Sequence, residues 1–171
     1  MTQLIRPSEK IILALDGMDK DQVIELLSKL PDLLWVKIGL ELFINAGPAF
    51  INTLRDNGKK VFLDLKFHDI PSTMAKACRQ ATKTGAELIT VHACSGIDAL
   101  LEANNSVIET SVEMGCSPPT LLAVTVLTSW TSSQLSKELL VGHSIDERVE
   151  HMAEMAFRAG IGGCICSPLE V

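Results

Sequence analysis

Three charged side chains lie close together in the segment VFLDLKFHDIP, residues 61–71. Asp64 and Lys66 stand two positions apart in an otherwise apolar, strand-like run, and a second acid, Asp69, follows three positions later. Because residues i and i+2 of a β-strand face the same side, the Asp64 carboxylate and the Lys66 ammonium are expected to point together. Asp69 is expected in the loop beyond the strand, just before a helix that begins at Pro71.

The chemistry open to these residues is that of a cationic acid. A lysine held between carboxylates keeps its proton, because nearby negative charge favours the cationic form. Such a lysine can stabilise a developing carbanion and then protonate it, whereas a Schiff-base lysine needs a desolvated or cationic setting. A structural Asp64–Lys66 ion pair is the alternative, but buried pairs seldom add stability. Asp16 and Lys37 end neighbouring predicted strands, and this gathering of charge favours a functional site.

A regular alternation of predicted strands and helices positions these side chains. Short runs rich in Ile, Val and Leu predict six strands of the kind that is covered on both faces. They span residues 10–16, 34–39, 60–66, 87–93, 121–127 and 163–167. Helical patterns fill the gaps, with a break at Pro48 between the second and third strands. The helix before the sixth strand opens with Ser144 and Glu147 at capping-box spacing.

This alternation predicts a parallel sheet with helical crossovers, either an open doubly wound sheet or a (β/α) barrel. Nearly every predicted strand has a polar residue at its C-terminal end, and in a barrel those ends converge on one mouth. The expected fold class is therefore α/β, of the TIM (β/α)8 barrel type, as a single domain over residues 1–171. Because a barrel needs eight strands and typically ~250 residues, the sequence is expected to cover about the first six βα units and to be truncated at its C-terminus.

Composition excludes several classes of protein. The chain has 171 residues, 47% apolar and 21% charged, which is an ordinary globular composition. A net charge of -6 without a basic tract argues against a nucleic-acid partner. No apolar run is long enough for a membrane span, and residues 1–10 lack the core of a signal peptide. Five cysteines at irregular spacings predict reduced thiols and a cytoplasmic location, with Cys164 and Cys166 buried as small apolar residues rather than forming a metal or redox pair.

The segment DLKFHDIPSTMAKA resembles the signature of the orotidine 5'-phosphate decarboxylase family, whose core is Asp-x-Lys-x-x-Asp followed by Ile-Pro. The similarity continues in order along nearly the whole chain, through LALD, VKIGLELF, VHA, VTVLTS and CSPLE. The resemblance implies loss of carbon dioxide from orotidine 5'-phosphate to give UMP, in de novo pyrimidine biosynthesis. It also implies that neither a metal nor an organic cofactor takes part.

The resemblance assigns roles to residues on the strand ends. Lys66 would be the proton donor to C6 of the pyrimidine, and Asp64 would lie beside the departing carboxylate. Lys37 would bond Asp64 and the ribose, and Asp16 would bond a ribose hydroxyl. Thr128, with its backbone, would contact the pyrimidine.

The resemblance also implies a homodimer with shared active sites. Asp69, Ile70 and Thr73 would reach into the site of the partner subunit, with Asp69 near Lys66 and the ribose. One family feature is missing from these 171 residues, namely the Gly-Ile-Arg-type loop after strand seven and the Gly-Arg after strand eight that grip the phosphate. A polypeptide without that grip is expected to lose kcat/KM, because remote binding energy serves the reacting centre.

Two alternatives stay open at this point. A decarboxylase of 3-keto-L-gulonate 6-phosphate shares the Asp-x-Lys-x-x-Asp motif but carries a metal-binding glutamate on strand two. This sequence has Lys37 there, and lysine does not ligate magnesium. The other alternative is an inactive barrel fragment that acts only as a dimerisation module. Among the histidines, His68 is expected to be structural, His92 is open between a site role and a structural one, and His143 and His151 are expected at the surface.

Overall fold

A single parallel sheet organises the computed structural model, which describes residues 7–170. Its strands are β1 (Ile12–Ala14), β2 (Trp35–Gly39), β3 (Lys60–Phe67), β4 (Leu88–His92), β5 (Thr120–Val124) and β6 (Gly163–Ile165). Each strand pairs in parallel with the next one along the chain, in the order β1-β2-β3-β4-β5-β6. All six predicted strands are therefore confirmed. The order has no reversal, as in a barrel, and excludes the doubly wound alternative.

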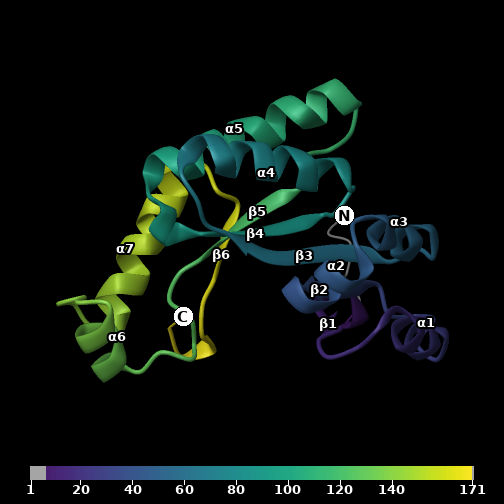
Figure 1. Cartoon of the computed structure of the whole chain (residues 1–171), viewed down its shortest axis with the longest axis horizontal. Helices are drawn as coiled ribbons and strands as arrows, with labels where there is room; N and C mark the ends of the chain where they lie inside the picture. The colour runs from purple at the N-terminus through teal and green to yellow at the C-terminus, as the bar shows by residue number, and fades with distance from the viewer. Residues whose placement is uncertain (1–6, 171) are drawn as a thin grey trace.

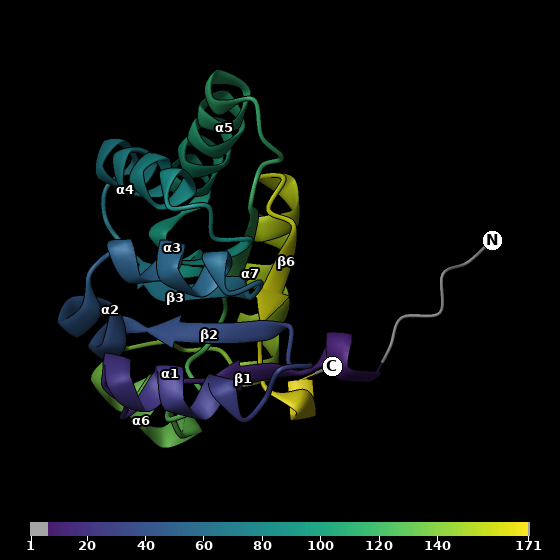
Figure 2. The ribbon, with the colours of Figure 1, turned by 90° about the vertical axis from the view of Figure 1, so that its right-hand side faces the viewer.

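Helices cover the outer face of this sheet (Figure 1). They are α1 (Lys20–Ser28), α2 (Leu40–Ala46), α3 (Ala49–Asp56), α4 (Pro71–Lys83), α5 (Ile97–Met114), α6 (Ser132–Glu138) and α7 (Ile145–Arg158), with 3-10 turns η1 (Pro7–Lys10), η2 (Ala93–Ser95) and η3 (Pro168–Glu170). In Figure 2, α1 and α3 lie beside β1–β3, whereas α4 and α5 pack against each other further along the sheet.

Local sequence explains where several helices begin and end. The expected break before Pro48 is present, because Gly47 adopts a φ of 72° between α2 and α3. Ser144 and Glu147 form the predicted capping box of α7. No separate range was predicted for α6, although Thr131 and Gln134 form the same kind of box at its start.

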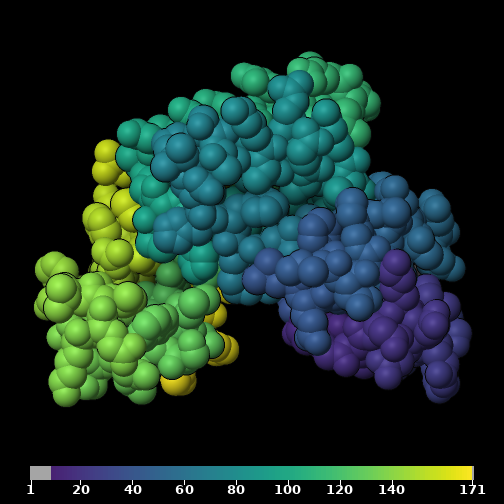
Figure 3. Space-filling view, in the orientation of Figure 1, coloured from purple at the N-terminus to yellow at the C-terminus, as the bar shows by residue number. Residues whose placement is uncertain are grey.

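The sheet curls without closing. Among the described residues β1 and β6 are its two edges, and the space-filling view shows the molecule hollowed between the lobe that carries β1 and the lobe that carries α6 (Figure 3). Leu63 and Leu65 of β3 belong to the buried core that the sheet forms with its helices. The alternate residues Phe62 and Asp64 are also buried, and strand alternation places them on the opposite, inner face.

Exposure of β6 corrects one expectation. Cys164 is exposed and Cys166 is half-buried, so the prediction that both are buried is wrong for Cys164, because β6 is an edge of the sheet within residues 7–170. All five cysteines are free thiols. None of the helices within residues 7–170 has the length and apolar character required to cross a bilayer.

Candidate active site

Asp64 is the centre of a charged cluster at the C-terminal ends of β1, β2 and β3. The Lys66 Nζ donates to both carboxylate oxygens of Asp64, at 2.9 and 2.8 Å. The Lys37 Nζ lies 3.6 Å from Asp64 Oδ2 and donates to both oxygens of Asp16, at 2.7 and 2.9 Å. The strand residues singled out from the sequence thus form one array in which negative and positive groups alternate, Asp16–Lys37–Asp64–Lys66.

Burial within this array is greatest at Asp64 and decreases toward both ends. The Asp64 side chain is 12% exposed, against 18% for Lys37, 32% for Lys66 and 59% for Asp16. A carboxylate that is removed from water is stabilised when it is paired and hydrogen-bonded, and two ammonium groups supply that pairing here. Lys66 remains accessible enough to meet a ligand while its ammonium is held by Asp64. The arrangement suits a fixed cationic proton donor.

An irregularity in β3 sets the direction of the Lys66 side chain. Lys66 has a φ of 52°, in the left-handed region that residues other than glycine rarely adopt. The pairing of β3 with β4 shifts at the same place, because Leu63 pairs with Ile89 and Phe67 pairs with Val91. Bulges of this kind re-aim side chains next to active sites. The meeting of Lys66 with Asp64 is therefore not the product of simple strand alternation alone.

Thr90 is a site residue that the sequence analysis did not single out. It is fully buried on β4, and its hydroxyl donates to Asp64 Oδ1 at 2.9 Å. The hydroxyl oxygen of Thr90 in turn accepts the backbone N–H of Lys66, also at 2.9 Å. The available signal was a lone hydroxyl in the apolar run LITV of the fourth strand.

His92 extends the site along β4. Its ring lies 5.4 Å from the His68 ring, centroid to centroid, and its Nδ1 is buried with no hydrogen-bond partner among the described residues. Burial, then His68 and the Lys66 ammonium, lower the pKa of His92 below its ordinary value of 6.5, and the Asp64 carboxylate opposes them. Both imidazoles line a cavity of about 250 Å³ that α6 and α7 help to close. His92 thus lines this cavity, and the lowered pKa favours its neutral form at neutral pH.

Comparison with known proteins gives this geometry a family. Residues 9–171 match the orotidine 5'-phosphate decarboxylase / HUMPS family. The chain belongs to this family. Two relatives named orotidine 5'-phosphate decarboxylase illustrate the similarity. One, from a strain of Prochlorococcus marinus, is 61% identical over 171 residues, which are 100% of this chain and 71% of the relative. The other, from Parasynechococcus marenigrum (strain WH8102), is 56% identical over 164 residues, 96% of this chain and 67% of the relative.

A solved structure agrees with the family assignment. The crystal structure of orotidine 5'-phosphate decarboxylase from Lactobacillus acidophilus matches this fold with a TM-score of 0.87 at 42% sequence identity. The match covers 94% of this chain and 72% of that one. Since this solved structure shares the curled arrangement, the barrel class predicted from the strand ends is confirmed.

The loop residues that the family resemblance singled out lie beyond the strand ends. Asp69 Oδ1 accepts the N–H of Ile70 at 2.7 Å, a local contact just before α4. The Asp69 side chain is exposed, that of Ile70 is 65% exposed, and that of Thr73 is exposed in the first turn of α4. Thr128 is exposed in the loop between β5 and α6. The structure thus gathers the strand residues and leaves these loop residues open to solvent.

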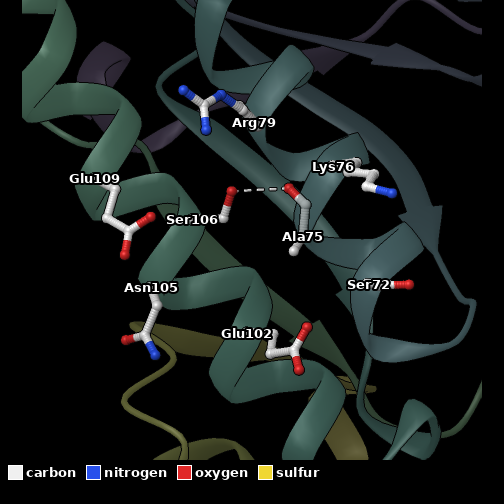
Figure 4. A pocket seen from close by; sticks show the side chains of 8 residues that line it. All are labelled: Ser72, Ala75, Lys76, Arg79, Glu102, Asn105, Ser106 and Glu109. Carbon is white, nitrogen blue, oxygen red and sulfur yellow. Dashed lines mark hydrogen bonds between the residues drawn. The ribbon is translucent and has the colours of Figure 1, made fainter.

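A second pocket lies among the helices, between α4 and α5 (Figure 4). It has a volume of about 440 Å³, and the Ser106 hydroxyl donates to the Ala75 carbonyl at 2.9 Å across it. Its charges offset one another: Arg79 pairs with Glu113 at 2.8 Å, and Glu102 and further polar groups line the wall. Within residues 7–170, no three His, Cys, Asp or Glu side chains are grouped to hold a metal ion. The strand-end cluster is therefore the candidate site.

Proposed function

We propose that this chain catalyses the decarboxylation of orotidine 5'-phosphate to UMP, as a carboxy-lyase of de novo pyrimidine biosynthesis. The observation that carries the proposal is the Lys66 ammonium bonded to both oxygens of the buried Asp64 carboxylate. Relatives with this named activity, 54–61% identical over the whole chain, support it.

Each side chain of the array takes one part in the proposed reaction. The bond between C6 and the carboxylate carbon breaks, carbon dioxide leaves, and the electron pair stays on C6. The Lys66 ammonium stabilises that charge and then transfers a proton to C6, after which the neutral amine takes a proton from water. Asp64 holds the ammonium in place. The proton and the stabilising charge both come from side chains, so the proposed reaction uses no metal or organic cofactor.

The remaining polar residues are proposed to bind the substrate. Lys37 and Asp16 would bind ribose hydroxyls, since both project from the ends of β1 and β2 beside Asp64. Thr128 would contact the pyrimidine from the loop after β5. The alternative substrate, 3-keto-L-gulonate 6-phosphate, is disfavoured because the Lys37 ammonium occupies the strand-two position where that enzyme has a magnesium ligand.

We further propose a homodimer in which each subunit completes the site of the other. Three loop and helix residues of each subunit would reach into the partner's active site, namely Asp69, Ile70 and Thr73. Their exposure beyond the strand ends supports this. Mixing Lys66→Ala and Asp69→Asn variants, each inactive alone, should restore turnover, because the hybrid dimer contains one site with both native residues. An Asp69→Asn variant with native turnover, or a mixture that stays inactive, contradicts a shared site.

The remaining expectations concern the domain and its location. We propose a single barrel domain, because one sheet contains all the described strands and one buried core packs that sheet against its helices. We propose a cytoplasmic location, and the five free thiols agree with a reducing compartment.

The test of the function is the fall in absorbance of orotidine 5'-phosphate in the presence of EDTA. The full polypeptide that carries these residues should turn over this substrate undiminished by the chelator, and should leave 3-keto-L-gulonate 6-phosphate unchanged. Loss of turnover in EDTA, or turnover of the sugar phosphate alone, would favour the magnesium-dependent alternative. No turnover of either substrate would favour the remaining alternative, an inactive barrel fragment that acts only as a dimerisation module.

A further inference from the structure

Thr90 stands alone opposite the distorted stretch of β3. Between the pairs Leu63–Ile89 and Phe67–Val91, the single residue Thr90 of β4 faces Asp64, Leu65 and Lys66 of β3. The backbone of one β4 residue cannot pair with the N–H and C=O groups of three β3 residues in a regular ladder. Some of the β3 backbone groups therefore need other hydrogen-bond partners. The side chain of Thr90 supplies one of them, because its Oγ1 accepts the Lys66 N–H at 2.9 Å.

The direction of both hydrogen bonds at Thr90 is fixed by chemistry. A hydroxyl has one proton to donate and lone pairs to accept with. The Lys66 amide can only donate and the Asp64 carboxylate accepts, so the Thr90 proton goes to Asp64 Oδ1 at 2.9 Å. Lys66 Nζ returns to the same carboxylate at 2.9 and 2.8 Å. Thr90, Asp64 and Lys66 therefore close a ring that joins the backbone of Lys66 to its own ammonium through two side chains.

This ring of hydrogen bonds holds the backbone of Lys66 in a strained conformation. Lys66 has a φ of 52°, which a residue with a Cβ holds only when its surroundings fix it. Thr90 is 0% exposed, so water does not replace its hydroxyl at the Lys66 amide or at the carboxylate. A valine has nearly the same shape and would leave both groups without this partner.

We propose that Thr90 is a positioning residue, whose hydroxyl fixes the Asp64 carboxylate and the left-handed backbone of Lys66 in one geometry. This inference rests on the proposed function, because Asp64 and Lys66 are the pair assigned to the proton transfer. Thr90 does not itself meet the reacting atoms. It holds the ammonium at the angle and distance that the transfer to C6 requires.

Two substitutions separate the hydroxyl of Thr90 from its packing. Thr90→Val keeps the volume and removes the hydroxyl, whereas Thr90→Ser keeps the hydroxyl and removes the methyl group. The matched control is Thr110→Val in α5, where another fully buried threonine donates only to the Ser106 carbonyl, at 2.6 Å. Thermal unfolding of all three variants establishes that they fold.

Steady-state turnover of orotidine 5'-phosphate is the first measurement. Thr90→Val should lower kcat about 100-fold with little change in KM, as a small misplacement of a reacting group does. Thr90→Ser should restore most of kcat although it loses packing, and Thr110→Val should keep native kcat. Native kcat in Thr90→Val, or an equal loss in Thr90→Ser, overturns the proposal.

Amide hydrogen exchange at Lys66 is the second measurement, and it needs no turnover. The Lys66 N–H should exchange at least about tenfold faster in Thr90→Val than in Thr90→Ser or Thr110→Val, because only the valine removes its acceptor. Equal exchange in the three variants overturns the proposal. If the native protein does not turn over orotidine 5'-phosphate, the proposed function fails. The exchange rates alone then decide whether the Thr90 hydroxyl fixes the backbone of Lys66.

Discussion

Replacing Asp64 with asparagine should destabilise the fold, although active-site substitutions often stabilise one. The substitution keeps the shape of the side chain and removes its charge. It leaves the ammonium groups of Lys37 and Lys66 facing each other around a neutral amide, at positions where they are 18% and 32% exposed. Loss of a catalytic group often stabilises a fold because strain at the site is relieved. Here that gain in stability is smaller than the stability lost with the carboxylate that pairs with both ammonium groups.

The size of the effect follows from the distances. Lys66 Nζ lies 2.8 Å and Lys37 Nζ 3.6 Å from Asp64 Oδ2. At an effective dielectric constant of ~20, each attraction is about 5 kcal/mol, and desolvation of the carboxylate offsets much of it. Breaking a buried pair from one side costs roughly 3–5 kcal/mol. Because Lys66 is partly exposed and Lys37 keeps its bond to Asp16, we expect a loss of about 2–3 kcal/mol in the free energy of unfolding.

Urea unfolding at pH 7 measures this loss, and thermal unfolding should show a Tm lower by about 4–12 °C for a chain of this size. Glu25→Gln is the control, because Glu25 pairs at 2.6 Å with Lys29 where both side chains are mostly exposed. It should change the free energy by at most about 0.5 kcal/mol. An Asp64→Asn variant as stable as the native chain, or more stable, would refute the ion-pair account.

Three further predictions concern groups outside the array. Lys59 is buried and its Nζ donates to three backbone carbonyls before β2, the shortest at 2.7 Å, so Lys59→Met should lower the free energy of unfolding by about 1–3 kcal/mol in urea titrations. Because the pKa of His92 in the folded chain lies below 6.5, the unfolded chain binds a proton at this residue more readily. The stability that neutral His92 contributes is therefore complete above pH 6.5 and is lost as the pH falls through the folded pKa. Unfolding at pH 7.5 and 5 should therefore show a weaker pH dependence in His92→Gln than in the exposed-site control His151→Gln. Burial raises the pKa of the Cys78 thiol to about 12, so a thiol reagent at pH 8 should modify exposed Cys116 and spare Cys78 until the chain unfolds; equal rates would contradict its burial.

The arrangement of strands and helices was largely readable because its signals are local. Alternating apolar runs and the capping box at Ser144 depend on residues a few positions apart, and the break before Pro48 depends on one glycine. The bounds of helix α6 were not predicted, even though Thr131 and Gln134 form the same capping signal. Its short polar sequence, SSQLSKE, has no long apolar stripe to mark it as a helix.

The sequence singled out the four charged residues of the array but not the geometry that joins them. Spacing along β3 placed Asp64 and Lys66 together, but nothing in the letters DLK specifies the left-handed backbone at Lys66. Thr90 lies 26 positions from Asp64 and meets it only through the β3–β4 register, which a single sequence does not fix. The exposure of Cys164 likewise depends on which strands flank β6, not on its own sequence.

Turnover by a Lys66→Ala variant tests the central claim most directly, because the proposed charge stabilisation and proton transfer both depend on that ammonium. The matched control is Lys29→Ala, an exposed lysine at the C-terminal end of α1. Decarboxylation of orotidine 5'-phosphate should fall at least about 1,000-fold in Lys66→Ala, since both charge stabilisation and the proton donor are lost, and should be unchanged in Lys29→Ala. Native turnover in a folded Lys66→Ala variant would contradict the account.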